Sequence, residues 1–188
     1  MTDDPYVYPG TSILRNRLGL TDAAALARLE RRLVTQRLRE GAPAGTFDFD
    51  HLRAIHRHLF QDIFDWAGEP RTVEIAKGGQ QFQLRRFLAN GMADVRRRLR
   101  ASGYLRGRSQ EDFAAAAGEI IGDVNFLHPF RDGNGRTQLL YLQQLADGAG
   151  HTFDLTLLHR EAWISACRRS HLGDNAALAA CIVAAIRS

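Results

Sequence analysis

Cysteine is scarce in this 188-residue chain, which has only Cys167 and Cys181, and neither belongs to a C-x-x-C motif. This scarcity argues against a zinc site and against a disulfide framework. Apolar runs are short as well, and none approaches the ~18 residues that a membrane helix requires. The opening segment, MTDDPYVYPG, is acidic and aromatic, unlike a signal peptide. We therefore expect a cytoplasmic protein with no membrane contact, or one secreted as an effector by a route that needs no such signal.

A strong excess of charge of one sign is also missing, since the formal net charge is only +4 and arginines are scattered among acidic residues. The exception is RRRLRASGYLRGR, which spans Arg96 to Arg108. A solvated helix face is the favoured interpretation of this segment, and contact with an acidic partner or nucleic acid is the alternative. The sequence as a whole favours a protein partner over nucleic acid.

Two common kinds of binding site have no counterpart in the sequence. The phosphate-binding patterns G-x-x-x-x-G-K-[ST] and G-x-G-x-x-G do not follow any predicted strand. His51, His56 and His58 are separated by five and two residues on one predicted helix, so they do not share a face as zinc-binding pairs do. A phosphate site, if present, must be built in another way.

Helical periodicity dominates the sequence, in which 45% of the residues are hydrophobic and many recur at steps of three and four. Asp22 is a good helix N-cap, and Ser109 has the capping-box spacing to Asp112. Because single cores hold roughly 100–200 residues, we expect one domain. The pattern predicts an all-α domain with helices over residues 21–38, 48–64, 85–102, 109–127, 133–147, 157–170 and 175–187.

The period changes from helical to alternating between Thr72 and Leu84. Apolar and polar residues alternate on both sides of a Lys-Gly-Gly-Gln segment at 77–80, which is typical of a hairpin turn. The pattern predicts a short exposed β-hairpin, the only sheet of the domain. A segment that merely joins two helices is the alternative.

The stretch HPFRDGNGR, from His128 to Arg136, concentrates residues suited to phosphate chemistry. Glycines on both sides of Asn134 allow tight backbone turns and the close approach of a ligand. The next helix begins here, so its unpaired N–H groups and dipole favour an anion. Arg136 adds a bidentate donor for phosphate oxygens.

The same stretch contains a candidate base and a candidate metal ligand. His128 follows the preceding helix, and a pKa near ~6.5 suits removal of a proton from a hydroxyl. A carboxylate beside a polyphosphate, here Asp132, suits Mg²⁺, which takes few protein ligands. Each residue alone also has a purely structural explanation: a packed histidine, an Asp helix cap, loop glycines and a surface arginine. The combination is what favours a catalytic site.

HPFRDGNGR resembles the signature of the Fic domain family, His-x-Phe-x-Asp/Glu-Gly-Asn-Gly-Arg-x-x-Arg. The segments YVYPGTSILRNRLGL, FDWAGEPRTVEIAKGG and WISACRRSHLGD also resemble stretches of that family, so the likeness spans nearly the whole chain. It implies a single Fic-like domain over residues 1–188, a helical bundle with one β-hairpin flap. Its parts would be an N-terminal arm at 1–20, the flap at 72–84 and a catalytic loop at 128–136.

The resemblance implies a protein adenylyltransferase of the Fic/Doc type, which moves AMP from ATP to a Tyr, Thr or Ser hydroxyl and releases pyrophosphate. His128 would take the hydroxyl proton, Phe130 would anchor the loop in the core, and Asp132 would hold Mg²⁺. The nucleotide phosphates would bind to Gly133, Asn134, Gly135 and Arg136. The target protein would add a strand to the flap, through Val73, Glu74, Ile75, Ala76, Lys77 and Gly78.

Leu139 departs from the family pattern, which has a second arginine at this position. One helical turn after Arg136, that arginine would contact the γ-phosphate. Three hypotheses stay open: a weakened adenylyltransferase, a transferase of phosphate or another phosphate-linked group, and a catalytically silent Fic-like scaffold that only binds a partner. Gln138 is a candidate substitute contact, although an uncharged amide is a poorer clamp.

The family's inhibitory glutamate motif, Ser/Thr-x-x-x-Glu-Gly/Asn, is absent, and the nearest match, from Thr35 to Glu40-Gly41, is one residue too long. Its absence resembles family members that are controlled by a separate small antitoxin carrying an inhibitory helix. Such a toxin–antitoxin pair is therefore one expectation for the partner. The target protein and the oligomeric state are not predicted by any feature of the sequence.

Overall fold

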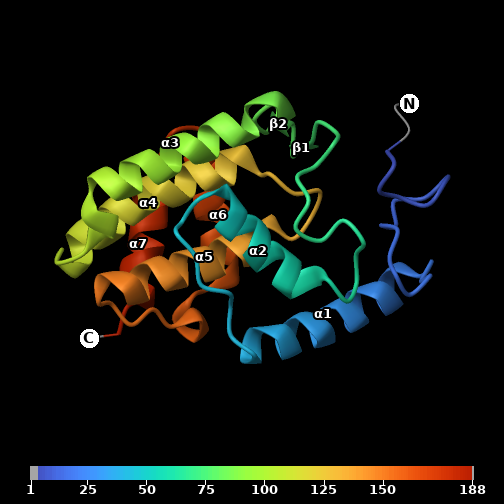
Figure 1. The fold of residues 1–188 in the computed structure, drawn as a ribbon, viewed down its shortest axis with the longest axis horizontal. Helices are drawn as coiled ribbons and strands as arrows, with labels where there is room; N and C mark the ends of the chain where they lie inside the picture. Colours follow the sequence, from blue (N-terminus) through green and yellow to red (C-terminus); the bar gives the residue numbers. More distant parts are fainter. Residues whose placement is uncertain (1–3, 188) are drawn as a thin grey trace.

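The fold is an assembly of helices with one small hairpin, and a computed structural model describes it for residues 4–187. Within that range, the sheet is a single antiparallel pair of strands, and short 3₁₀ turns lie at Arg85–Phe87, Gly103–Leu105 and Leu155–Leu157. The predicted all-α class with one β-hairpin is confirmed (Figure 1). The elements are α1 (Ala23–Arg39), α2 (Phe49–Phe60), β1 (Ala76–Lys77), β2 (Gln80–Gln81), α3 (Leu88–Ala101), α4 (Gln110–Leu127), α5 (Asn134–Ala149), α6 (Arg160–His171) and α7 (Ala176–Ala185).

Capping residues explain where several helices begin. The carboxylate of Asp22 accepts a hydrogen bond from the N–H of Ala25, and the hydroxyl of Ser109 accepts one from the N–H of Asp112. Each side chain thereby satisfies one of the N–H groups that a helix start leaves without a partner. Both predicted caps are confirmed.

Three predicted helix boundaries are wrong by about a turn. The second helix ends at Phe60, although Ile63 and Phe64 are still buried, so periodicity identified core residues beyond the helix itself. Residues 85–87 form a 3₁₀ turn before α3, and residues 155–157 form another before α6. Apolar spacing does not distinguish such turns from the first turn of an α-helix.

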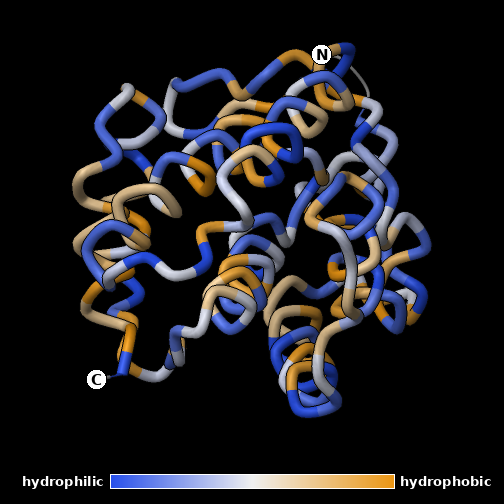
Figure 2. The backbone as a smooth tube through the Cα atoms, turned by 60° about the vertical axis from the view of Figure 1, so that its left-hand side comes forward, coloured by the Kyte–Doolittle hydropathy of each residue, from blue (hydrophilic) through white to orange (hydrophobic). Residues whose placement is uncertain are grey.

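The helix α4 lies at the centre of the core, where it packs against α3, α5, α6 and α7. Gly118 allows α4 and α7 to approach closely, because a Cβ at this position would lie 3.2 Å from the backbone nitrogen of Ala179. Hydrophilic and hydrophobic residues alternate along the helices in Figure 2, as expected when each helix buries one face. The helix α1 lies along one edge of the molecule and packs against α2 (Figure 1).

The β-hairpin is confirmed, but its ladder is shorter than the predicted segment 72–84. Only Ala76 with Gln81 and Lys77 with Gln80 form strand pairs. Gly78 and Gly79 have φ values of 59° and 80°, the positive angles that a two-residue hairpin turn of the primed type requires. The flanking residues 72–75 and 82–84 form two stems without regular secondary structure, which hold the hairpin where α3 begins and α4 ends (Figure 1).

The N-terminal arm connects distant parts of the chain. The hydroxyl of Tyr6 accepts a hydrogen bond of 3.0 Å from the N–H of Thr72, at the start of the flap. Asp4 accepts one of 2.9 Å from Nε of Arg131, inside the catalytic loop. The N-terminal arm thus forms hydrogen bonds both to the start of the flap and to the catalytic loop, and links the two segments. None of the helices in the described range is long and apolar enough to cross a bilayer.

Candidate active site

His128 lies directly after α4, where the chain turns sharply into the catalytic loop. Its backbone has the left-handed conformation, with φ 46° and ψ 59°, and its N–H still bonds to the carbonyl of Val124. The ring Nδ1 lies 3.1 Å from the carbonyl oxygen of Asn125. Because a carbonyl can only accept, Nδ1 carries the hydrogen and Nε2 carries the lone pair. The tautomer is therefore the one that a general base needs.

The imidazole of His128 is covered by the flap. The ring of Phe82 stacks on it, with centroids 3.8 Å apart and an interplanar angle of 15°. The pKa of His128 is lowered from 6.5 to about 4, mainly by burial and in addition by the nearby charges of Lys77 and Arg71. The hydrogen bond to Asn125 and the charge of Asp132 act in the opposite direction. The ring is therefore neutral at physiological pH, and it is a weaker base than the value near ~6.5 used in the sequence prediction implied.

The start of α5 forms the other half of the site, and its two glycines have different roles. Gly133 has φ 80°, and a Cβ there would lie 2.5 Å from the ring of Phe60, so the fold itself requires glycine. Gly135 has no such requirement, because a Cβ there would meet nothing within 4 Å. The open space in front of Gly135 lies at the N–H groups that a helix start leaves unpaired, where an anion binds favourably.

Asn134 shapes the loop with its side chain. Its Oδ1 accepts from the N–H of Phe130 at 2.9 Å, and its Nδ2 donates to the carbonyl of Phe130 at 2.8 Å. Phe130 is 1% exposed and stacks on His56, with ring centroids 3.9 Å apart. Because the side chain is buried and holds the loop in this way, the backbone N–H of Asn134 is the group left to face a phosphate.

Arg136 is already oriented by two side chains that sequence patterns did not indicate. Its Nη2 lies 2.5 Å from a carboxylate oxygen of Glu30 on α1, and its guanidinium lies 4.6 Å from the ring centroid of Phe60. The ion pair occupies one end of the guanidinium fork, and five N–H donors are available in total. The remaining donors can bind phosphate oxygens.

Asp132 fits the role of a magnesium ligand. Its Oδ1 accepts from the N–H of Gly133 at 2.5 Å, and the side chain is exposed at the mouth of the loop. No cluster of three or more His, Cys, Asp or Glu side chains suitable for a metal is found in residues 4–187. A single carboxylate beside a phosphate site suits Mg²⁺, which keeps several waters and takes ligands from the nucleotide.

Neither Gln138 nor Leu139 supplies a positive charge in place of the second arginine of the family pattern. Leu139 packs partly buried against the core. Gln138 is only 2% exposed, and both polar atoms of its amide lack hydrogen-bond partners in the described structure. An interior side chain cannot serve as a surface clamp, so Gln138 is excluded as a substitute for the second arginine.

His56 supports the loop from below, a role that helical spacing alone did not reveal. Its Nδ1 accepts from the N–H of Gly68 at 2.8 Å, and its Nε2 lies 3.0 Å from the carbonyl oxygen of Asp132. Burial lowers its pKa to about 4, so the ring is neutral and uses both nitrogens. A histidine on the buried face of the predicted helix was the available signal.

Four of the six arginines from Arg96 to Arg108 have partners within the described structure, as expected for a structural helix face, and one of them is Arg96, which pairs with Asp48. Arg98 forms ion pairs with Asp94 and Asp123, and Arg97 forms one with Asp94. The side chain of Arg106 donates to the carbonyl of Gly148 at 3.1 Å. These contacts favour the structural interpretation of the segment over nucleic-acid binding.

The flap residues named by the resemblance lie on the first stem and the turn. Val73 and Ile75 are half-buried, whereas Glu74, Ala76, Lys77 and Gly78 are exposed. Their alternation agrees with the predicted pattern, and the second stem brings Phe82 onto His128. The backbone edge of β1 is therefore exposed close to the proposed base.

A neutral, buried histidine on the loop that leads to a helix start is suited to phosphate-group chemistry. Residues 46–146 match the family model described as the Fic/DOC family. A probable protein adenylyltransferase of Sinorhizobium fredii is 40% identical over 179 residues, which cover 95% of this chain and 93% of that protein. A probable protein adenylyltransferase Fic of Salmonella typhimurium is 36% identical, with coverage of 97% and 92%.

Solved structures agree with these sequence relatives. The BepC effector protein of Bartonella tribocorum, determined with bound AMPPNP, superimposes with a TM-score of 0.89 at 25% identity, and the match covers 97% of this chain and 96% of that one. The chain belongs to the Fic/DOC family, and its enzyme class is protein adenylyltransferase.

Proposed function

We propose that this protein transfers AMP from ATP to a Tyr, Thr or Ser hydroxyl of a target protein. The observation that carries the proposal is the free Nε2 of His128, held neutral on the loop that leads to the N-terminus of α5. Phosphoryl-type transfer depends mainly on positioning and charge stabilisation, and this loop supplies both.

The nucleotide phosphates bind to the N–H groups of Asn134 and Gly135 and to the guanidinium of Arg136. The helix dipole adds a positive potential at the same place. Support for this assignment comes from Gly135, whose missing side chain leaves space that the fold does not need. Glu30 keeps the guanidinium in place for the incoming anion.

His128 starts the reaction by accepting the hydroxyl proton at Nε2. The hydroxyl oxygen then bonds to the α-phosphorus, the bond between the α-phosphorus and its bridging oxygen to the β-phosphate breaks, and pyrophosphate leaves. Asp132 would hold Mg²⁺, which supplies positive charge to the phosphates when it is bound. The hydrogen bond from Nδ1 to Asn125 keeps the ring oriented throughout.

The target protein binds to the flap as an added strand, with the residues from Val73 to Gly78 as the main contacts. Main-chain hydrogen bonds to an exposed edge fix the register of a bound segment without requiring a long sequence motif. The exposed edge of β1 and the position of Phe82 over His128 support this proposal.

The decisive experiment uses ATP labelled on either the α- or the γ-phosphate, with magnesium and a lysate that contains target proteins. We expect transfer of the α-label only, and none by His128→Asn. This variant is chosen because Asn tolerates the left-handed backbone at position 128 and retains an amide donor. Transfer of the γ-label would indicate a phosphotransferase, whereas binding of target without either label would indicate a scaffold.

We further propose that the target is inactivated in the cytoplasm, by a toxin under the control of a small antitoxin or by an effector delivered into another cell. BepC is described as a translocated effector, which supports the second form. Expression of the protein should arrest growth only when His128 is intact. The inhibitory glutamate of such an antitoxin would lack its usual arginine partner, because Leu139 occupies that position.

A further inference from the structure

We infer that Arg71 is a positioning residue that fastens the flap to the catalytic loop, so that target binding and the orientation of His128 depend on one side chain. The guanidinium is fully buried, and its N–H groups donate to carbonyl and carboxylate oxygens of the flap and of the catalytic loop. The kinetic part of this inference rests on the proposed function, whereas the structural part does not.

On the side of the catalytic loop, Arg71 holds the backbone around the proposed base. Its Nε donates to the carbonyl of His128 at 2.9 Å, and its Nη2 lies 3.4 Å from the carbonyl of Leu127. Its own N–H donates to the carbonyl of Pro129 at 2.8 Å. Three consecutive carbonyls of a sharply turned segment are thereby satisfied, and this fixes the left-handed conformation of His128.

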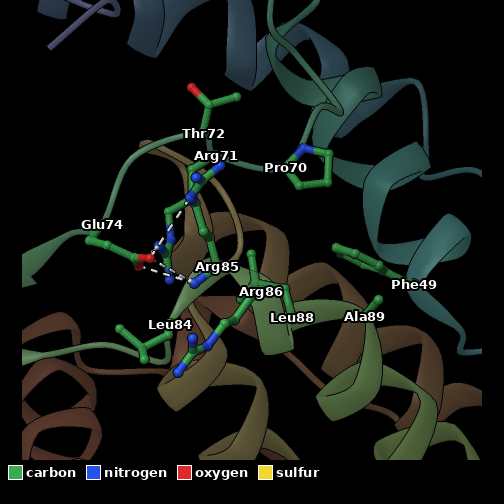
Figure 3. Close-up of a pocket in the computed structure, with 10 residues that line it drawn as sticks. All are labelled: Phe49, Pro70, Arg71, Thr72, Glu74, Leu84, Arg85, Arg86, Leu88 and Ala89. Atoms are coloured by element: carbon green, nitrogen blue, oxygen red, sulfur yellow. Dashed lines mark hydrogen bonds and ion pairs between the residues drawn. The ribbon is translucent and has the colours of Figure 1, made fainter.

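On the side of the flap, Arg71 joins the two stems. Its Nη1 donates to the carbonyl of Val73 at 2.8 Å and to the carboxylate of Glu74 at 3.0 Å, and its Nη2 donates to the carbonyl of Gln83. The carboxylate of Glu74 also accepts from the N–H of Arg85, at 3.0 Å. Figure 3 shows this bridge, with dashed lines from Glu74 to Arg71 and Arg85.

The chemistry of the guanidinium explains why arginine suits this position. A planar fork with five donors can serve two segments at once, whereas a lysine ammonium has three donors at a single point. Arg71 also forms a wall of a cavity of about 730 Å³, which is lined further by Leu84, Arg86 and Phe49 (Figure 3). The stems therefore border a hollow. On that side they are not closely packed, and the hydrogen bonds of Arg71 hold them in place.

Arg71 influences the orientation of His128, the proposed base, in two ways. The first is direct, through the carbonyl of His128. The second passes through the flap, because the stem that Arg71 holds at Gln83 also carries Phe82, which stacks on the imidazole. Displacement of the stems would therefore disturb both the target site and the base.

Two variants test the inference, one by disturbing both segments and the other by disturbing the stems alone. Arg71→Lys retains the charge but cannot serve both segments, while Glu74→Gln weakens only the bridge between the stems. We expect Arg71→Lys to raise the KM for the target and to lower kcat, each by about tenfold, since a hydrogen bond to a charged group is worth roughly that factor. Glu74→Gln should raise the KM for the target while kcat stays within about twofold, since its hydrogen bonds go to Arg71 and Arg85 and not to residues 127–129.

The nearby pair of Arg53 and Glu69 provides matched controls. Arg53 donates to Glu69 at 3.0 Å and to the carbonyl of Gly68, but it contacts neither the stems nor residues 127–129 in the described structure. Arg53→Lys and Glu69→Gln should leave kcat and both KM values unchanged. Equal effects of Arg53→Lys and Arg71→Lys would overturn the inference, because they would indicate a general loss of stability.

Amide hydrogen exchange tests the structural part of the inference and does not require an activity assay. In Arg71→Lys, the N–H groups of Phe82 and Gln83, which bond to Ile75 and Phe126, should exchange at least about tenfold faster, while those in the middle of α4 stay as in the wild type. Should Arg71→Lys fail to fold, the same comparison is made with Glu74→Gln. Unchanged exchange in the stems would overturn the inference, and this result does not depend on whether the wild type transfers AMP.

Discussion

The rings of Phe82 and His128 lie in face-to-face contact, 3.8 Å apart, so that a flap residue covers the proposed catalytic base. The ring of Phe82 also forms a T-shaped contact with the ring of His171, at a centroid distance of 5.3 Å. The flap is thus part of the environment that keeps the imidazole dry. Target binding, burial of the base and the protonation state of the base are linked through one aromatic side chain.

Removal of this cover should change the acidity of the base. In Phe82→Ala we expect the pKa of His128 to rise from about 4 toward 6.5, because water then reaches the ring and stabilises the charged form. Titration of the imidazole by NMR measures this directly. Phe87→Ala, at an exposed position on the 3₁₀ turn before α3, is the control. An unchanged pKa in Phe82→Ala would show that other groups keep the ring dry.

The two glycines at the start of α5 should respond in opposite ways to the same substitution. Gly135→Ala should leave the fold intact or stabilise it by up to about 1 kcal/mol, since alanine is the better helix former. The same change should weaken ATP binding by about tenfold or more, because the methyl group intrudes where phosphate must approach. Thermal unfolding and nucleotide titration separate the two effects.

Gly133→Ala, in contrast, should lower the unfolding temperature, because φ 80° and the ring of Phe60 both exclude a Cβ. Undiminished ATP affinity in Gly135→Ala would contradict the placement of phosphate at this helix end.

Restoration of the missing arginine should raise activity. Leu139→Arg places a cation one turn after Arg136, and its aliphatic stem can retain part of the packing that Leu139 makes with the core. A phosphate contact of about 1.5–3 kcal/mol corresponds to a roughly ten- to hundredfold gain in kcat/KM for ATP. Leu139→Met is the uncharged control. If both variants behave like the wild type, the γ-phosphate lies elsewhere.

Acidification should destabilise the wild type more than His128→Asn. The folded-state pKa of His128, about 4, lies below the unfolded value of 6.5, so between these pH values the unfolded chain binds a proton that the folded chain does not. Stability is therefore unaffected by this group above pH 6.5 and falls as pH decreases through the window, by up to about 1.4 kcal/mol per unit.

Urea unfolding of both proteins between pH 7 and pH 4.5 measures this difference. The free energy of unfolding of the wild type should fall relative to that of His128→Asn as the pH decreases, since only the wild type loses this contribution. Parallel curves would mean that His128 is not buried in its neutral form.

Local patterns predicted much of this structure, because they act over a few residues. The spacing behind Asp22 and Ser109 identified helices whose caps form as expected, and two adjacent glycines identified the hairpin turn. The catalytic loop was recognisable for the same reason, since its base, acid, glycines and arginine are contiguous in the sequence.

The supporting residues escaped prediction because their partners are distant in the chain. Glu30 and Arg136 are 106 residues apart in the sequence, and they come into contact only when α1 lies beside the start of α5. Arg71 and His56 contact the catalytic loop after the flap and α2 have packed against it. The spacing of Glu30 and Arg71 does not differ from that of ordinary positions, and the position of His56 indicated burial but not its partner, so these contacts are visible only in the folded structure.

The ion pair between Glu30 and Arg136 bears on how much of the chain makes a working unit. The match to the family model spans residues 46–146 and includes every residue of the signature, but Glu30 lies outside it. So do Tyr6 and Asp4, which fasten the flap and the catalytic loop from the arm. A fragment cut to the matched segment would keep the recognisable motif and lose its supports. The contacts that support the catalytic loop therefore extend beyond the segment that the family model matches.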